Sequence, residues 1–145
     1  MRTPCRSARG FTLIEMLITM SIIAIIAAIA IPSYQEQIRR TRRADARQEL
    51  MRFATAQERF YTNCNRFALA LNGATATCSG LDAATATVNS SNGYYAISMV
   101  SDGATYTLTA TPRLAQVTDT GCGILTLTDA GLRGSTGTLP SADCW

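Results

Sequence analysis

Residues 9–18 read RGFTLIEMLI, and they open an apolar run that continues to Ile31. The run from Phe11 to Ile31 is 21 residues long, and Glu15 is its only ionisable side chain. As an α-helix it would be about 31 Å long, which matches the thickness of the hydrocarbon core of a bilayer. The stretch therefore predicts a membrane-length helix, and it raises the question of why that helix carries a carboxylate near its start.

A secretory signal peptide is the alternative interpretation of this N-terminus. Such a signal has a basic start, an apolar core of about 7–15 residues and a cleavage site of small residues, for which Ala28–Ala30 would serve. The apolar run here is longer than such a core, and it contains Glu15. A charged residue inside the apolar core is unfavourable, because a charge at the bilayer centre costs about 2.5–3.5 kcal/mol on insertion scales. The pattern therefore favours a retained helix over an ordinary signal.

The charges on either side of the apolar run give conflicting indications about its orientation. Three arginines precede the run and five follow it closely: Arg2, Arg6 and Arg9, then Arg39, Arg40, Arg42, Arg43 and Arg47. Counted alone, they would place the C-terminal part in the cytoplasm by the positive-inside rule. We expect the opposite orientation, because the cysteines of the C-terminal part need an oxidising compartment to pair.

Four of the five cysteines lie in the polar part of the chain: Cys64, Cys78, Cys122 and Cys144. Two disulfides are the natural interpretation, because a metal site would need closer Cys-x-x-Cys spacing or histidine, and the chain has no histidine. Four cysteines allow three pairings. We favour the sequence-local pairing, which joins the first to the second and the third to the fourth. Each disulfide would contribute about 3 kcal/mol to the stability of the fold.

The composition excludes several classes of enzyme. Without histidine there is no Ser-His-Asp triad, no Cys-His pair and no histidine-ligated metal, and the sequence has no GxxxxGKS/T loop for a nucleotide phosphate. Asp119, Asp129 and Asp143 would offer oxygen ligands to Ca²⁺, but they follow no recognised loop pattern, and positions in turns explain them more simply. We therefore predict a protein that is not an enzyme and needs no metal or cofactor.

Beyond Ile31 the pattern is that of an amphipathic helix. Pro32 ends the unbroken apolar run and predicts a kink, because proline removes a backbone donor and clashes with the preceding turn. From Ser33 to about Thr62, apolar residues recur near one helical face: Ala46, Leu50, Phe53, Ala54, Phe60 and Tyr61. The sequence therefore predicts one long helix with an apolar first half and an amphipathic second half.

Alternating residues near the C-terminus predict an antiparallel sheet. Apolar and polar residues alternate over 95–99 and over 106–110, and Asp102-Gly103 between them is typical of a hairpin turn. Residues 123–128 predict a third strand and residues 132–137 a short fourth. Such a sheet must cover one apolar face, and the amphipathic half of the helix is the available partner. The predicted fold class is α+β, a long N-terminal helix packed on a sheet of about four strands.

The N-terminal 27 residues from 9 to 35, RGFTLIEMLITMSIIAIIAAIAIPSYQ, resemble the signature of type IV pilins. The resemblance implies that a prepilin peptidase cuts after Gly10 on the cytoplasmic side of the membrane and methylates the new N-terminus at Phe11. The ammonium of Phe11 would then neutralise Glu15, either four residues away on the same helix or, as the resemblance suggests, in a neighbouring subunit. Either pairing would set the axial register of packed helices and account for the carboxylate.

Three C-terminal segments carry a second resemblance. YYAISM, YTLTATP and CGILTLTDAGLRGS, which lie in that order between Tyr94 and Trp145, resemble the sheet of the minor-pilin group called PilE. This resemblance implies an antiparallel sheet on the helix and a C-terminal loop bounded by a disulfide, here assigned to Cys122 and Cys144. The implied fold is the type IV pilin fold.

We expect four parts along the chain. A leader occupies residues 1–10, a transmembrane and filament-core helix residues 11–31, and its amphipathic continuation residues 32–62. Residues 63–145 form a head of loop and sheet. Its first part, residues 63–92, is rich in Ala, Thr, Ser, Asn and Gly, which indicates a connecting region without regular elements.

The expected function is structural: a minor subunit of a type IV pilus that supports pilus biogenesis, twitching motility or adhesion. The chain would cross the inner membrane once, with its head in the periplasm, until an inner-membrane assembly platform extracts it into an extracellular fibre. Its helix would pack there against other major and minor pilins. A pseudopilin of a type II secretion system and a DNA-uptake (competence) pilin are the alternatives. Binding of nucleic acid is less expected than assembly with other pilins, because acidic residues are interleaved with the arginines of residues 39–59. A solvated helix face that meets neighbouring subunits explains these arginines.

Overall fold

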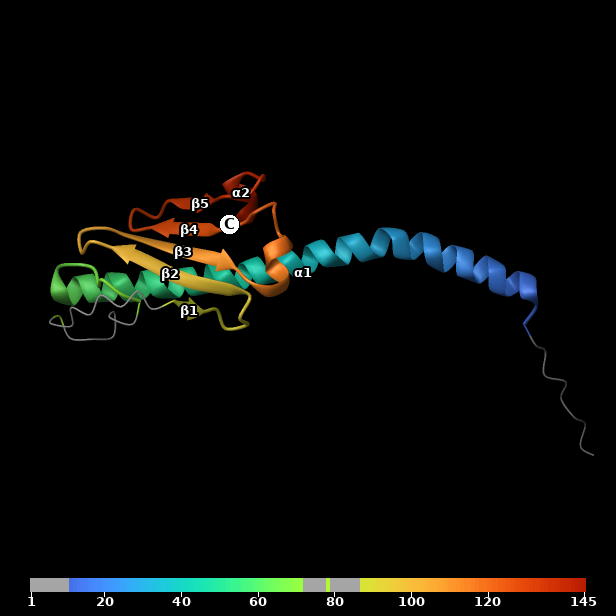
Figure 1. Cartoon of the computed structure of the whole chain (residues 1–145), viewed down its shortest axis with the longest axis horizontal. Helices are drawn as coiled ribbons and strands as arrows, with labels where there is room; N and C mark the ends of the chain where they lie inside the picture. The colour runs from blue at the N-terminus through green and yellow to red at the C-terminus, as the bar shows by residue number, and fades with distance from the viewer. Residues whose placement is uncertain (1–10, 72–77, 79–86) are drawn as a thin grey trace, which may run out of the picture. The chain divides into compact units, whose positions relative to one another are not determined.

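Figure 1 shows a computed structural model of the chain, which describes residues 11–71, 78 and 87–145. Helix α1 runs over Leu13–Cys64, and a five-stranded antiparallel sheet follows it in the order β1-β2-β3-β4-β5. The strands are Val88–Asn89, Tyr95–Ser101, Tyr106–Pro112, Leu125–Thr128 and Arg133–Ser135. A 3₁₀ helix, η2, spans Leu114–Thr118, and a short helix, α2, spans Ser141–Cys144. The predicted combination of a long helix and an antiparallel sheet is confirmed.

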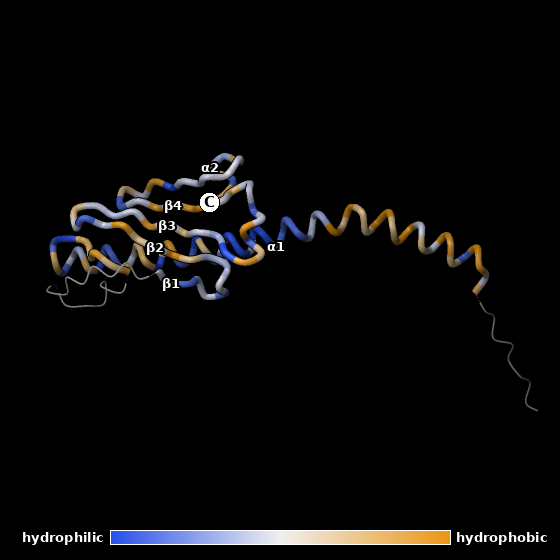
Figure 2. Tube along the Cα trace, viewed as in Figure 1, coloured by the Kyte–Doolittle hydropathy of each residue, from blue (hydrophilic) through white to orange (hydrophobic). Residues whose placement is uncertain are grey.

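The chain divides into two compact units, one ending at Gln37 and the other spanning Ile38–Trp145. In the first unit α1 is mostly apolar as far as Ile31, as the mainly orange colour in Figure 2 shows, and it continues through Pro32. By length and composition, α1 is the one helix among the described residues that is long and apolar enough to cross a membrane. This apolar part of α1 is not covered by other described parts of the chain.

The second unit has its core between α1 and one face of the sheet. Alternate residues of β2, β3 and β4 are buried, and they pair across the strands in register, as Met99, Leu108 and Leu127 do. Ala46 and Leu50 of α1 belong to the same core. The strict alternation of apolar and polar residues determines which face turns inward, because successive side chains of a strand point to opposite faces.

Three features of this unit differ from expectation. The sheet has a fifth strand because Val88–Asn89 pairs with Ile97 and Ala96, inside the stretch expected to lack regular elements. Within that same stretch, Phe67 and Leu71 are buried in the core. Tyr61, expected on the buried face of the helix, is 41% exposed, although its ring lies 4.8 Å from that of Phe67.

Candidate assembly site

The residues expected to mark processing and assembly lie at the start of the chain. Gly10, the expected cleavage position, and the rest of the leader lie outside the described residues. Phe11 is 79% exposed and precedes α1, and Glu15 is exposed in the first turn, where its backbone N–H donates to Thr12 Oγ1 at 3.3 Å. Before cleavage the nitrogen of Phe11 is an amide rather than an ammonium. The pairing of Phe11 with Glu15 therefore stays a prediction.

The apolar side chains on both sides of Glu15 in the sequence are exposed on all sides of the helix. Among the large ones are Leu13, Ile14, Met16, Leu17, Ile18, Met20, Ile22, Ile23, Ile25, Ile26, Ile29 and Ile31. Burying a side chain of this size is worth about 1.5–3 kcal/mol, so covering the whole segment is worth about 20 kcal/mol or more. A surface of this kind requires lipid or the helices of other chains around it.

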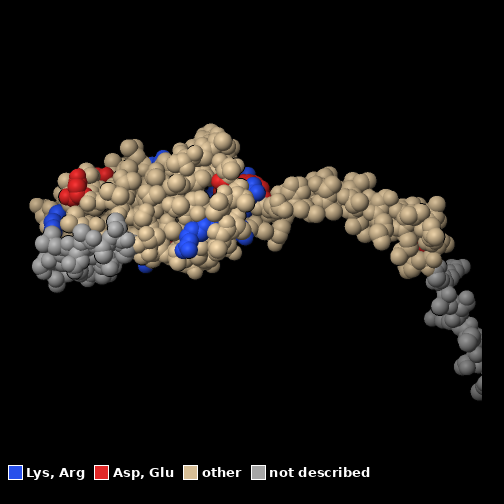
Figure 3. All heavy atoms as spheres, viewed as in Figure 1, with Lys and Arg blue, Asp and Glu red and all other residues tan. Residues whose placement is uncertain are grey.

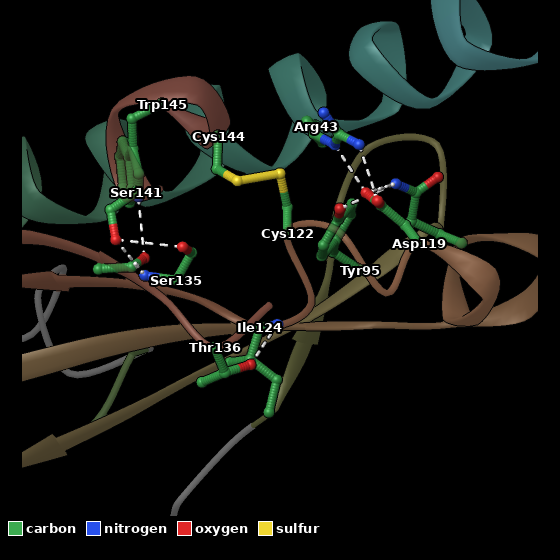
Figure 4. The surroundings of a disulfide bond; sticks show 12 residues. Arg43, Tyr95, Asp119, Cys122, Ile124, Ser135, Thr136, Ser141, Cys144 and Trp145 are labelled. Carbon is green, nitrogen blue, oxygen red and sulfur yellow. Dashed lines mark hydrogen bonds and ion pairs between the residues drawn. A yellow bond between two sulfur atoms is a disulfide. The ribbon is translucent and has the colours of Figure 1, made fainter. Parts of the chain in front are cut away.

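The cysteines pair locally along the sequence, Cys64 with Cys78 and Cys122 with Cys144. The second pair is buried, whereas Cys78 is exposed. Figure 4 shows the second disulfide, which ties α2 to the segment before β4. α2 is also held against β5, the last strand of the sheet, because the backbone N–H of Ser135 donates to Ser141 Oγ at 3.1 Å.

A buried ion pair near that disulfide joins α1 to Asp119, the residue that follows η2. Arg43 donates from Nε and Nη2 to the two carboxylate oxygens of Asp119, at 2.6 and 2.7 Å. Gln116 of η2 donates to the same carboxylate at 2.8 Å and to the hydroxyl of Tyr95 at 3.1 Å. The network in Figure 4 therefore links the helix, η2 and strand β2 at one end of the head.

The environment of this network sets the charge states of its members. Burial by itself would raise the pKa of Asp119, but the hydrogen bonds and the charge of Arg43 outweigh it, and the pKa is lowered. The charge of Arg39 also lowers the pKa of Asp119. Burial raises the pKa of Tyr95 to about 12. At neutral pH the pair is therefore ionised, and the phenol that accepts from Gln116 is neutral.

Other arginines and acids of α1 hold the turn between β1 and β2. The guanidinium of Arg42 lies 4.2 Å from the ring centre of Tyr94. Asp45 accepts from the side-chain amide of Asn92 at 3.1 Å. Glu49 likewise accepts from the hydroxyl of Ser91 at 2.7 Å and pairs with Arg52. Part of the arginine cluster therefore serves the fold, and the expectation of a solvated face is wrong for Arg43, which is 4% exposed.

Sequence reasoning missed this network, although one signal for it was present. Arg43 lies three residues before Ala46 and Gln57 lies seven residues after Leu50, so both polar residues fall on the apolar stripe of the helix. A polar residue on such a stripe needs a partner in the core. Asp119, interpreted as a turn residue, is that partner for Arg43. For Gln57 the partners are the backbone N–H of Ala68 and the sulfur of Met99.

Two protein families match adjacent segments of the chain. Residues 5–31 match the prokaryotic N-terminal methylation motif. Residues 32–126 match the family described as type IV minor pilin ComP, DNA uptake sequence receptor. The second match covers well over half of the chain and includes α1 beyond Ile31, the first three strands and η2.

Individual relatives are similar mainly over part of their length. The chain is 42% identical over 59 residues to the type IV major pilin protein PilA of Myxococcus xanthus, covering 41% of this chain and 27% of that protein. It is 46% identical over 50 residues to the prepilin peptidase-dependent protein D of Escherichia coli, covering 34% of each. These alignments thus span only about a quarter to a third of the curated relatives. The solved structure of a type IV pilin from Shewanella oneidensis superposes with a TM-score of 0.51 and 28% identity, covering 74% of this chain and 97% of that one.

Proposed function

The chain belongs to the family of type IV minor pilins that ComP represents, and on this premise we propose that it is a minor subunit of a type IV pilus. Pilins are structural subunits rather than enzymes, and they assemble with other pilins. In the proposed sequence of events a prepilin peptidase cuts after Gly10 and methylates Phe11. Residues 11–31 then span the inner membrane, with residues 32–145 on the periplasmic side, until the subunit enters the extracellular fibre.

The observation that carries this proposal is the uncovered apolar part of α1. Its side chains are exposed around the whole circumference of the helix, so it suits an environment that is apolar on every side. A bilayer provides that environment before assembly, and a bundle of similar helices provides it in a fibre. Glu15 has a role in the second environment, because its carboxylate would meet the ammonium of Phe11 of a neighbouring subunit and fix the register.

Replacing the carboxylate by an amide tests this role directly. We expect Glu15→Gln to leave the subunit in the membrane and to lower its amount in sheared fibres at least about tenfold. The reason is that the amide cannot form the ion pair with the ammonium of Phe11 that would fix the register of the packed helices. Immunoblots of the fibre and membrane fractions measure the ratio. Gln35→Ala, a change at an exposed polar position just beyond the apolar segment, is the matched control. Normal incorporation of Glu15→Gln into fibres would overturn the register mechanism.

Mass spectrometry of the subunit taken from the membrane tests processing independently. The expected N-terminal peptide begins at Phe11 and carries one methyl group on its nitrogen. Detection of peptides that contain Arg9 and Gly10 in the mature fibre would contradict cleavage at this bond.

DNA uptake is the second candidate, and the description of the matched family as a DNA uptake sequence receptor favours it. The described part of the head has few basic side chains for such a role, and Figure 3 shows them as isolated groups on a mostly uncharged face. Arg113 and Arg133 are exposed on the sheet side, whereas Arg43 is enclosed in its ion pair. A DNA-binding test therefore belongs at Arg113 and Arg133.

Gel-shift titrations of the full chain over a range of salt concentrations provide this test. If the head binds DNA, changing Arg113 and Arg133 to Gln should weaken binding to all sequences and lower the slope of log affinity against log salt by about 1 for each arginine that no longer binds a phosphate. Arg52→Gln is the control, because Arg52 pairs with Glu49 on the helix. Binding with no response to either arginine would remove this surface as the site of DNA binding.

A further inference from the structure

The 3₁₀ helix η2 presents apolar side chains to the outside of the head. Leu114 is 71% exposed and Val117 is 61% exposed, with Ala115 exposed between them. Gln116 is fully buried and holds η2 through its bonds to Tyr95 and Asp119. Because this anchor points inward, the residues on both sides of it are presented outward on a fixed support. We call Leu114, Ala115 and Val117 the η2 patch.

The backbone at the first residue of the patch is strained. Leu114 has a φ of 53°, in the left-handed region that suits glycine or asparagine and disfavours a bulky side chain. A leucine here is both strained and exposed to solvent, so neither backbone conformation nor burial in the head accounts for it. Its apolar side chain is therefore available for a contact outside the head.

The surroundings of the η2 patch are basic. Arg113 precedes it and is exposed, and Arg42 lies nearby over Tyr94, whose carbonyl accepts from the backbone N–H of Arg113. In Figure 1 η2 is the orange 3₁₀ turn beside α1, at the end of the sheet where β3 stops. The acid that directly follows η2, Asp119, is neutralised by Arg43. Apolar side chains beside an exposed arginine suit a surface that binds anionic lipid.

We propose that the η2 patch docks the head onto the anionic surface of the membrane that the chain's own helix spans, before the subunit is assembled. This inference rests on the proposed insertion of residues 11–31 in the membrane. Arg113 contributes attraction to lipid phosphates, and Leu114 and Val117 enter the headgroup region. Docking of this kind holds the unassembled head in one orientation at the membrane and is released when the subunit leaves it.

Hydrogen exchange measured on the full chain in vesicles tests the docking. The vesicles contain either phosphatidylcholine alone or phosphatidylcholine with about one third phosphatidylglycerol. We expect the amides of residues 113–119 to exchange at least about threefold more slowly with phosphatidylglycerol, and the protection to fade at about 0.5 M salt. The amides of β3 serve as an internal reference in the same protein.

Leu114→Asn separates lipid contact from a purely structural role. Asparagine tolerates the left-handed backbone, so the thermal unfolding temperature should stay the same or rise, while the protection by phosphatidylglycerol should disappear. Val100→Asn is the matched control, since Val100 is 74% exposed near the opposite end of β2 and should keep the protection. Protection that survives Leu114→Asn would overturn the proposal.

Two further outcomes decide between partners and between proposals. If protection of residues 113–119 rises with the protein-to-lipid ratio and ignores lipid charge, the patch binds another pilin subunit, and the lipid proposal is wrong. Flotation of the vesicles after an alkaline carbonate wash reports insertion of the helix separately. A chain that floats without protection refutes the docking alone, whereas a chain that does not float refutes the insertion on which it rests.

Discussion

Breaking the ion pair between Arg43 and Asp119 tests how much this contact contributes to holding the head against α1. The change is Asp119→Asn, which keeps the shape of the side chain and an acceptor for Gln116 but removes the negative charge. Arg43 then remains as a cation whose side chain is 5% exposed. An arginine cannot shed its proton at any ordinary pH, so the unpaired charge persists.

The expected loss of stability follows from the burial of the two groups. Removing one partner of a buried ion pair costs about 3–5 kcal/mol, because the other charge stays uncompensated in the interior. A folded domain has a total stability of about 5–15 kcal/mol. For a unit of about a hundred residues, a loss of this size lowers the unfolding temperature by about 10–20 °C.

Circular dichroism of the full chain in detergent, followed on heating, measures the change. Asp129→Asn is the control variant, since it removes a carboxylate from the turn between β4 and β5. The double variant Arg43→Met with Asp119→Asn removes both charges, and it should recover at least half of the missing stability, because an uncharged pair in the interior costs less than a lone charge. A destabilisation by Asp119→Asn no larger than that of the control, or a double variant as unstable as the single one, would refute the reasoning.

The same pair predicts a pH dependence with a definite sign. The pKa of Asp119 is lowered in the folded head, where Arg43 outweighs the effect of burial. Its contribution to stability is therefore complete above the unfolded-state pKa of about 4 and is lost as the pH falls through the lower folded-state pKa. The unfolding temperatures of the wild type and Asp119→Asn should differ at neutral pH and converge in strong acid.

Two more predictions concern covalent links and the alkaline limit. Without denaturant, dithiothreitol should reduce the disulfide of Cys64 with the exposed Cys78 at least about a hundredfold faster than the buried disulfide of Cys122 with Cys144. Alkylation followed by mass spectrometry measures both reduction rates. Equal rates would contradict the argument from burial. Burial raises the pKa of Tyr95 to about 12, so the phenol stabilises the head below the unfolded-state pKa of about 10, and this contribution is lost as the pH rises toward 12. Tyr95→Phe should flatten that alkaline fall in unfolding temperature, and an unchanged slope would rule out the assignment.

Local periodicity was sufficient to predict the longer strands of the sheet. The alternation over residues 95–99 predicts that Tyr95, Ile97 and Met99 share one face of a strand, and all three are in the core. The strand Val88–Asn89 lacked such a signal, because two residues are too few to show a period and the strand depends on the edge that β2 offers it. Short elements of this kind are defined by their partners rather than by their own sequence.

The polar contacts of the head could not be predicted in the same way. The position of Arg43 on the apolar stripe indicates that it is buried, but its partner lies 76 residues further along the chain. Nothing in a local pattern of the helix selects Asp119 over the other acids of the head. That choice depends on how the sheet and η2 fold back onto α1, which sequence periodicity does not encode.

Glu15 and Asp119 show a difference between the two units of the chain in how a costly charge is placed. Each is a carboxylate in a place where an isolated charge is costly, within an apolar run for Glu15 and within the folded head for Asp119. Asp119 is paired with an arginine of the same chain, and the residues of the head's core are covered by the same chain. In the first unit Glu15 is exposed and the surrounding apolar side chains are uncovered. We infer that the head is completed by folding and the first unit by assembly, which is why a cation for Glu15 is expected at the N-terminus of another subunit.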